Sequence, residues 1–227
     1  MVSSVNILER IIETPLEFLD RKSIRLLRAF WDGYTHKMEN LEPYQNGIKI
    51  NHNFQSWLEG KYNIQLCKSW SNIILLYSEN EEEAFYQFIR FKEEYVAKTQ
   101  SSFLETTMPK AASNIKELFE VISEIKKRPA MFLGEPSFEL CAAYLDGYIK
   151  AREDSGKTES EEEKLFSEFK KQIEREKLIT TGPSWKKIVQ FYADSDGSES
   201  QYGALAIFFK WLDFFLVSAD SPLSRKR

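Results

Sequence analysis

The chain contains Lys126-Lys127-Arg128-Pro129-Ala130-Met131-Phe132-Leu133-Gly134-Glu135-Pro136-Ser137, which leads into an apolar run that ends in Leu145-Asp146-Gly147-Tyr148. A related stretch lies 114 residues earlier, with nine identities over twenty positions in one unbroken register. The identical residues of the earlier stretch are Pro15, Phe18, Leu19, Ser23, Leu26, Ala29, Asp32, Gly33 and Tyr34. Self-similarity at one spacing is the signature of a repeat, so we predict a tandem internal duplication.

Each copy opens with a helical pattern that a proline interrupts. Apolar residues spaced three and four apart predict a helix over 7–12 in the first copy and over 118–125 in the second. Pro15 and Pro129 disfavour the helical conformation of the residue before them, so we expect each helix to end about two residues ahead of its proline.

The next helix of each copy carries a cap and a glycine. We expect it to start close to Ser23 or Ser137, because a serine hydroxyl can bond free backbone N–H groups at a helix start. Gly33 and Gly147 lie inside these helices, where glycine costs about 1 kcal/mol relative to alanine. A glycine at both positions therefore predicts a close crossing by another helix.

Asp32 and Asp146 directly precede these glycines. One interpretation is structural, with each carboxylate hydrogen-bonded or at the surface. The other is functional, with the two carboxylates converging as a pair. The sequence leaves both interpretations open.

Three further helices are expected in each copy. Apolar spacing places them around 54–58, 69–77 and 84–95, and around 166–169, 184–192 and 204–215. Strands stay an alternative over 73–76 and 188–192, where the apolar runs are short and β-branched. The polar segments 39–53 and 153–163 are expected to be loops or helix extensions.

The predicted fold class is all-α, with two tandem copies of a roughly five-helix repeat related by internal duplication. We divide the chain into a first helical repeat over 1–97, a linker over 98–113, a second helical repeat over 114–217 and a polar tail over 218–227.

Composition limits the classes of partner and the compartment. The 227 residues carry a net charge of only -4, which disfavours general nucleic-acid binding because that needs a basic surface. No stretch approaches the roughly 20 apolar residues of a membrane span, and no cationic segment opens a signal peptide. Cys67 and Cys141 lie in apolar surroundings, which is typical of a reduced protein. We expect a cytoplasmic protein with no membrane or nucleic-acid partner.

Catalytic and metal-binding patterns are missing from the sequence. Only His36 and His52 are available, and no HExxH, CxxC, GxSxG, P-loop or dinucleotide glycine pattern occurs. Two cysteines and two scattered histidines lack the spacing of a metal site. We therefore expect a protein that is not an enzyme and that uses no cofactor and no metal.

Two acidic clusters are the first candidates for a partner-binding surface. Each precedes or opens the last helix of its copy, where the helix dipole also favours carboxylates, so a purely structural role accounts for them as well. The candidate residues are Glu79, Glu81, Glu82, Glu83, Asp194, Asp196 and Glu199. A second candidate is the loop over 42–53, because the two copies differ most there.

The segment from Lys127 to Glu135 resembles a motif of small bacterial proteins, usually Arg-Pro-Gly-Met-Tyr-Leu-Gly. Here Ala130 replaces the glycine and Phe132 the tyrosine. The first copy keeps the proline and the apolar pair but lacks the arginine, methionine and glycine, so any role of the arginine belongs to Arg128 alone.

Proteins with this motif resemble immunity proteins of bacterial polymorphic toxin systems. The resemblance implies a cytoplasmic antitoxin that binds a cognate protein toxin and occludes it without covalent chemistry. Because many toxins that act on nucleic acids or nucleotides are basic, we expect a basic partner for the acidic clusters. The alternative is a non-enzymatic helical scaffold or regulatory interaction protein of another bacterial pathway.

Overall fold

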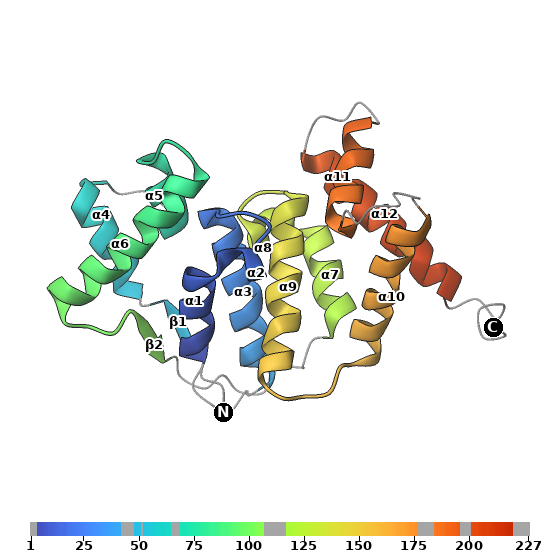
Figure 1. The fold of residues 1–227 in the computed structure, drawn as a ribbon, viewed down its shortest axis with the longest axis horizontal. Coiled ribbons are helices and arrows are strands. Elements are labelled where there is room, and N and C mark those ends of the chain that lie inside the picture. Colours follow the sequence, from blue (N-terminus) through green and yellow to red (C-terminus); the bar gives the residue numbers. More distant parts are fainter. Residues whose placement is uncertain are drawn as a thin grey trace. The chain divides into compact units, whose positions relative to one another are not determined.

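The structure is a computed structural model of the whole chain (Figure 1). It describes residues 4–41, 48–50, 52–64, 69–106, 117–176, 184–195 and 201–219. These residues form helices and a single pair of short strands, so the predicted all-α class is confirmed.

The helices keep the same order in both halves of the sequence. The first half contains α1 (Ser4–Glu13), α2 (Pro15–Phe18), α3 (Ile24–Leu41), α4 (His52–Tyr62), α5 (Trp70–Leu76) and α6 (Glu81–Thr99). The second contains α7 (Leu118–Lys127), α8 (Pro129–Leu133), α9 (Phe138–Asp154), α10 (Glu161–Glu176), α11 (Trp185–Ser195) and α12 (Gln201–Ala219). The segments 73–76 and 188–192, for which strands were an alternative, are helical.

Strand β1 (Ile48–Ile50) pairs antiparallel with β2 (Leu104–Thr106), with Lys49 opposite Glu105. Sequence analysis did not predict this ribbon, because β1 falls in a segment expected to be loop or helix and β2 in the expected linker. Three-residue strands are too short to show the alternation that marks a strand, and the pairing joins segments more than 50 residues apart.

The chain divides into two compact units. Unit 1 comprises Met1–Ile115 and Ala143–Lys157, and unit 2 comprises Lys116–Ala142 and Thr158–Arg227. The division falls inside α9. The boundaries predicted at 97, 113 and 217 were drawn from the sequence repeat and not from compactness. The division into two repeats stays a prediction.

Prolines and serines set the ends of the first helices of each half. The first helices end at Glu13 and Lys127, as predicted, and Pro15 and Pro129 then open the one-turn helices α2 and α8 where only a turn was expected. The Ser23 hydroxyl accepts the Leu26 N–H at 3.2 Å. Ser137 accepts the Leu140 N–H at 3.4 Å, so both predicted caps are confirmed.

Within unit 1, α3 crosses the 143–154 part of α9 at backbone contact (Figure 1). A Cβ atom on Gly33 would lie 2.0 Å from the carbonyl oxygen of Tyr144. A Cβ atom on Gly147 would lie 2.0 Å from the carbonyl oxygen of Phe30. The close helix crossing predicted from the two glycines is confirmed, since no other residue type allows this approach.

Aromatic side chains form the core among the last three helices of each half. In unit 1 the Phe54 ring lies 6.2 Å from Phe88 and 5.6 Å from Tyr95, measured between centroids. In unit 2 the Phe169 ring lies 6.1 Å from Phe208, and 5.4 Å from the Phe215 ring. The tryptophans Trp70 and Trp185 pack on Phe88 and Phe208, in agreement with a core role.

Candidate functional site

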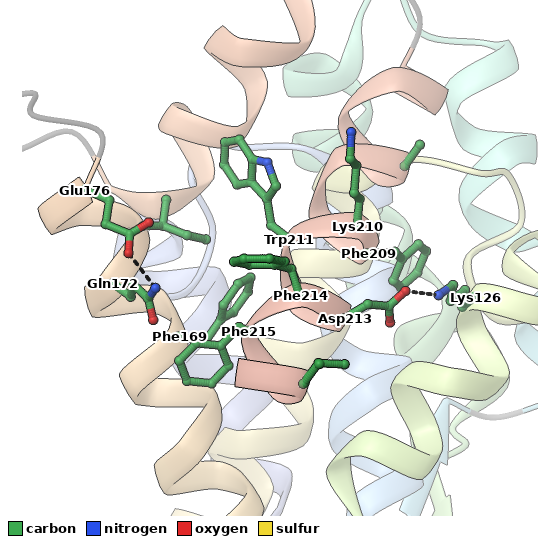
Figure 2. Close-up of a pocket in the computed structure, with 13 residues that line it drawn as sticks. Lys126, Phe169, Gln172, Glu176, Phe209, Lys210, Trp211, Asp213, Phe214 and Phe215 are labelled. Atoms are coloured by element: carbon green, nitrogen blue, oxygen red, sulfur yellow. Dashed lines mark hydrogen bonds and ion pairs between the residues drawn. The ribbon is translucent and has the colours of Figure 1, made fainter. Parts of the chain in front are cut away.

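Unit 2 carries an open hollow of about 900 Å³ (Figure 2). Helices α10 and α12 form most of its lining, and Lys126 of α7 reaches one edge. Its aromatic lining residues are Phe169, Phe209, Trp211, Phe214 and Phe215, and Ile173, Ala206 and Val217 add aliphatic groups. A hollow of this size and lining can receive apolar side chains of a partner molecule.

The hollow exists because α12 is apolar on more than its core-facing side. Ala204, Phe208 and Leu212 are buried in the core of unit 2. On the opposite side, Phe214 and Val217 each remain 74% exposed. A helix that is apolar nearly all round is normally covered on every side, so the exposed side of α12 is a candidate interaction surface.

Charged groups of both signs surround the apolar floor. Lys126 forms an ion pair with Asp213 at 2.5 Å, and its ammonium lies 5.8 Å from the centre of the Phe209 ring. On the α10 side, the Gln172 amide donates a hydrogen bond to Glu176 at 2.5 Å (Figure 2). The surface can therefore bury apolar groups in its middle and pair charges at its edges.

The corresponding surface of unit 1 is closed by side chains of the chain itself. Lys61 of α4 donates to both carboxylate oxygens of Glu94 at 2.8 Å. Its ammonium also lies 5.2 Å from the Trp57 ring and 5.1 Å from the Phe91 ring. Hydrogen bonds from Lys61 and Lys98 lower the pKa of Glu94, so this carboxylate is charged and the pair is formed at neutral pH.

In the register of the predicted repeat, the matching positions of unit 2 hold different side chains. Adding 115 to the α4 numbers replaces Trp57 by Gln172 and Lys61 by Glu176. Adding 120 to the α6 numbers replaces Glu94 by Phe214. Unit 2 therefore lacks the ion pair that covers unit 1, and an exposed ring stands in place of its carboxylate.

Two acidic residues predicted to bind a partner hold the start of α6 in place. The Glu81 carboxylate accepts hydrogen bonds from the Ser23 hydroxyl at 2.7 Å and from the Arg25 backbone N–H at 3.3 Å, and it pairs with the Arg25 guanidinium. Glu83 accepts the Glu79 N–H at 2.5 Å. Hydrogen bonds from that N–H and from the Gln87 side chain lower the pKa of Glu83.

The remaining acidic residues have varied positions. Glu79 and Glu82 are exposed, and Glu82 lies 3.3 Å from the ammonium of Lys22. Asp194 is exposed near the end of α11. Asp196 and Glu199 lie outside the described residues, as does most of the 42–53 loop and Cys67. That these acidic residues bind a partner stays a prediction.

The two aspartates before the crossing glycines are both partly accessible. Asp32 pairs with Arg28 one helical turn away at 3.3 Å. Burial raises the pKa of Asp32 to about 6, against the opposing attraction of the Arg28 guanidinium. Asp146 is half-buried. The Arg28 pair agrees with the structural interpretation for Asp32.

The crossing of α3 and α9 also assembles a polar cluster that sequence analysis missed. His36 Nδ1 forms a short hydrogen bond with the Tyr144 hydroxyl. Lys37 is buried, with its ammonium 4.6 Å from the centre of the Tyr148 ring. The signal was present, because His36 lies one turn after Gly33 and Tyr144 one turn before Gly147, so a crossing at the glycines brings them together.

A second polar contact lies further along the same two helices. The Tyr34 hydroxyl donates to Asp154 at 3.2 Å, and Lys150 pairs with Asp154 at 2.8 Å. Burial raises the pKa of Tyr34, and the neighbouring Asp154 carboxylate adds to that rise. The Tyr34 bond joins the interior of α3 to the C-terminal end of α9, where Lys150 of the same helix also holds Asp154.

Comparison with known proteins adds no relative to this account. No protein-family model, no curated protein and no solved structure matches the chain. Within the described ranges, no group of three or more His, Cys, Asp or Glu side chains could hold a metal ion. No helix in the same ranges is long and apolar enough to cross a membrane.

Proposed function

We propose that this protein is a cytoplasmic antitoxin that binds a cognate bacterial toxin and blocks it by non-covalent occlusion. The single observation that supports the proposal best is the exposed apolar side of α12, where Phe214 and Val217 lie open beside the hollow of unit 2. Protein interfaces concentrate their binding energy in a few large apolar side chains that a partner fully desolvates. The resemblance of the motif around Arg128 to immunity proteins is the reason that we propose a toxin as the partner.

Charge supports a basic toxin as the partner. The chain carries a net charge of -4, and the exposed carboxylates of Glu79, Glu82 and Asp194 are free of the capping bonds that occupy Glu81 and Glu83. Opposite charge on the two proteins speeds their encounter and disfavours wrong partners. In this proposal the acidic residues attract the toxin, while apolar contacts hold it.

We also propose that the two halves of the chain arose by internal duplication. Three matches support this: the serine caps of α3 and α9, the reciprocal contacts of Gly33 with Tyr144 and of Gly147 with Phe30, and the common length of 19 residues of α6 and α12. A duplicated chain can keep one copy closed and open the other to a partner. That division agrees with the closed surface of unit 1 and the hollow of unit 2.

Co-expression tests the function. The product of the gene directly upstream is expressed in a bacterial host, alone and with this chain, and growth and co-purification are measured. The proposal expects growth arrest by the neighbour alone, rescue by this chain and a stable complex. A harmless neighbour, or a toxic one that this chain neither binds nor relieves, would favour the scaffold alternative.

A further inference from the structure

We propose that the hollow of unit 2 is a groove for one amphipathic helix of the toxin. The toxin helix lays its apolar stripe along α12, places a lysine or arginine over Glu176 and places an acidic residue over Lys210. This inference rests on the proposed function and names the binding surface and the chemistry of the partner segment.

The exposed stripe of α12 has the shape that a helix fits. Ala206, Lys210, Phe214 and Val217 all line the hollow and follow one another at spacings of four, four and three. At a rise of 1.5 Å per residue, the stripe is about 16 Å long, which corresponds to three turns. Rows at this spacing form the ridges and grooves into which another helix packs.

Unit 1 shows which chemistry closes such a surface. There the ammonium of Lys61 lies over the rings of Trp57 and Phe91 and pairs with Glu94, so one side chain contacts the aromatic rings and satisfies a charge. Two centroid distances of the aromatic cores, Phe54 to Phe88 and Tyr95 in unit 1 and Phe169 to Phe208 and Phe215 in unit 2, agree within about 0.2 Å. The opening in unit 2 coincides with the changed side chains Gln172, Glu176 and Phe214, all of which line the hollow.

The changed side chains specify the occupant. Glu176 stands where unit 1 has Lys61, so the cation that covers the rings must come from outside. Phe214 stands where unit 1 has Glu94, so an apolar side chain must cover it. Lys210 is exposed within the α12 stripe itself, where a carboxylate of the occupant can pair with it. A helix with an apolar stripe, one acidic residue within that stripe and a cation on its α10-facing edge meets all three requirements.

Transfer of the Lys61–Glu94 pair of unit 1 to the matching positions of unit 2 tests the groove. The double variant E176K/F214E recreates the Lys61–Glu94 pair on unit 2, and binding to the purified upstream gene product is measured by titration calorimetry. We expect the variant to keep its helical content and thermal midpoint and to bind about 30-fold more weakly or worse, the scale of a lost interface hot spot. Leu76→Glu, at an exposed apolar position of unit 1, is the matched control and keeps full affinity.

A second variant guards against a graft that fails to fold. Val217→Asp changes a side chain that is 74% exposed, so it leaves the core intact and is expected to weaken binding at least tenfold. If the wild type and both variants bind the toxin equally well, the groove is not the binding site, but the proposed antitoxin function still holds. If the wild type does not bind, both the groove and the proposed function are contradicted. A wild-type dimer in sedimentation that E176K/F214E converts to monomer would show that a second copy, and not a toxin helix, occupies the groove.

Discussion

Gly33 of α3 lies against the backbone of Tyr144 in α9 so closely that an added methyl group would meet the Tyr144 carbonyl oxygen at 2.0 Å. The equivalent glycine of α9, Gly147, makes the same contact with Phe30 of α3. Two helices that touch through reciprocal glycines cannot shift along one another without a clash. This crossing therefore fixes the register of the two helices in the core of unit 1.

Alanine at either glycine is expected to disrupt the crossing. Gly33→Ala or Gly147→Ala forces the added methyl into the facing backbone, and overpacking of a core costs about 1 to 3 kcal/mol or more. We expect the free energy of unfolding to fall by about 3 kcal/mol in each variant. Urea denaturation followed by circular dichroism measures the change.

Gly60 provides the matched control for these variants. It also lies in a helix, α4, but no atom comes within 4 Å of a Cβ atom placed on it. Gly60→Ala is expected to raise the free energy of unfolding by about 0.5 to 1 kcal/mol, since alanine is the better helix former. Equal effects of alanine at Gly33 and Gly60 would contradict the crossing.

Removal of the Glu81 charge is expected to loosen the contact between α3 and α6. Glu81→Gln loses its ion pair with Arg25 and weakens the hydrogen bond from Ser23. Hydrogen bonds to charged groups contribute about 1.5 to 3 kcal/mol, so we expect a loss of roughly 1 to 2 kcal/mol for this half-buried carboxylate. Thermal unfolding of Glu82→Gln, whose ion pair is exposed, should differ from the wild type by less than about 0.5 kcal/mol.

Asp32 should make stability depend on pH between about 4 and 6. Its pKa in the folded chain is about 6, above the ordinary value of 3.8, so the folded state holds this proton more tightly than the unfolded state. Stability from this group is therefore full below pH 4 and declines as the pH rises through 6. Asp32→Asn removes that decline.

Because 37% of the Asp32 side chain is exposed, water screens part of the effect. We expect Asp32→Asn to be more stable than the wild type by about 1 kcal/mol at pH 7, with a smaller difference at pH 4. Denaturation curves at both values measure it. A difference that grows toward acid would contradict the raised pKa.

The Phe54 ring is expected to be the most costly side chain of unit 1 to remove. It is fully buried and contacts the rings of Trp57, Tyr95 and Phe103, among others. Phe54→Ala should lower the free energy of unfolding by about 3 to 5 kcal/mol, the range for a phenylalanine removed from a core. Phe191→Ala, at a ring that is 59% exposed, should change stability by less than about 0.5 kcal/mol.

Sequence analysis succeeded where a local pattern has one physical cause. The glycines at 33 and 147 predicted the helix crossing because glycine is costly inside a helix unless space demands it. The caps at Ser23 and Ser137 followed from hydroxyl chemistry at helix starts. The caps needed only neighbouring residues, and the crossing needed the match between the two glycines 114 residues apart.

The candidate site could not be predicted in the same way. The closure of unit 1 depends on Lys61 and Glu94, which are 33 residues apart and come together only when α4 packs on α6. The hollow of unit 2 depends on the loss of that pair at Glu176 and Phe214. A comparison of surface positions between the two copies, and not of motifs, would have found it.

Binding of a toxin in the α10–α12 groove of unit 2 can be measured in one experiment. The purified upstream gene product is titrated calorimetrically into this chain and, in parallel, into E176K/F214E. We expect a one-to-one complex with the wild type and binding about 30-fold weaker, or absent, with the variant. Equal heats and equal affinity for the two proteins would contradict binding in this groove.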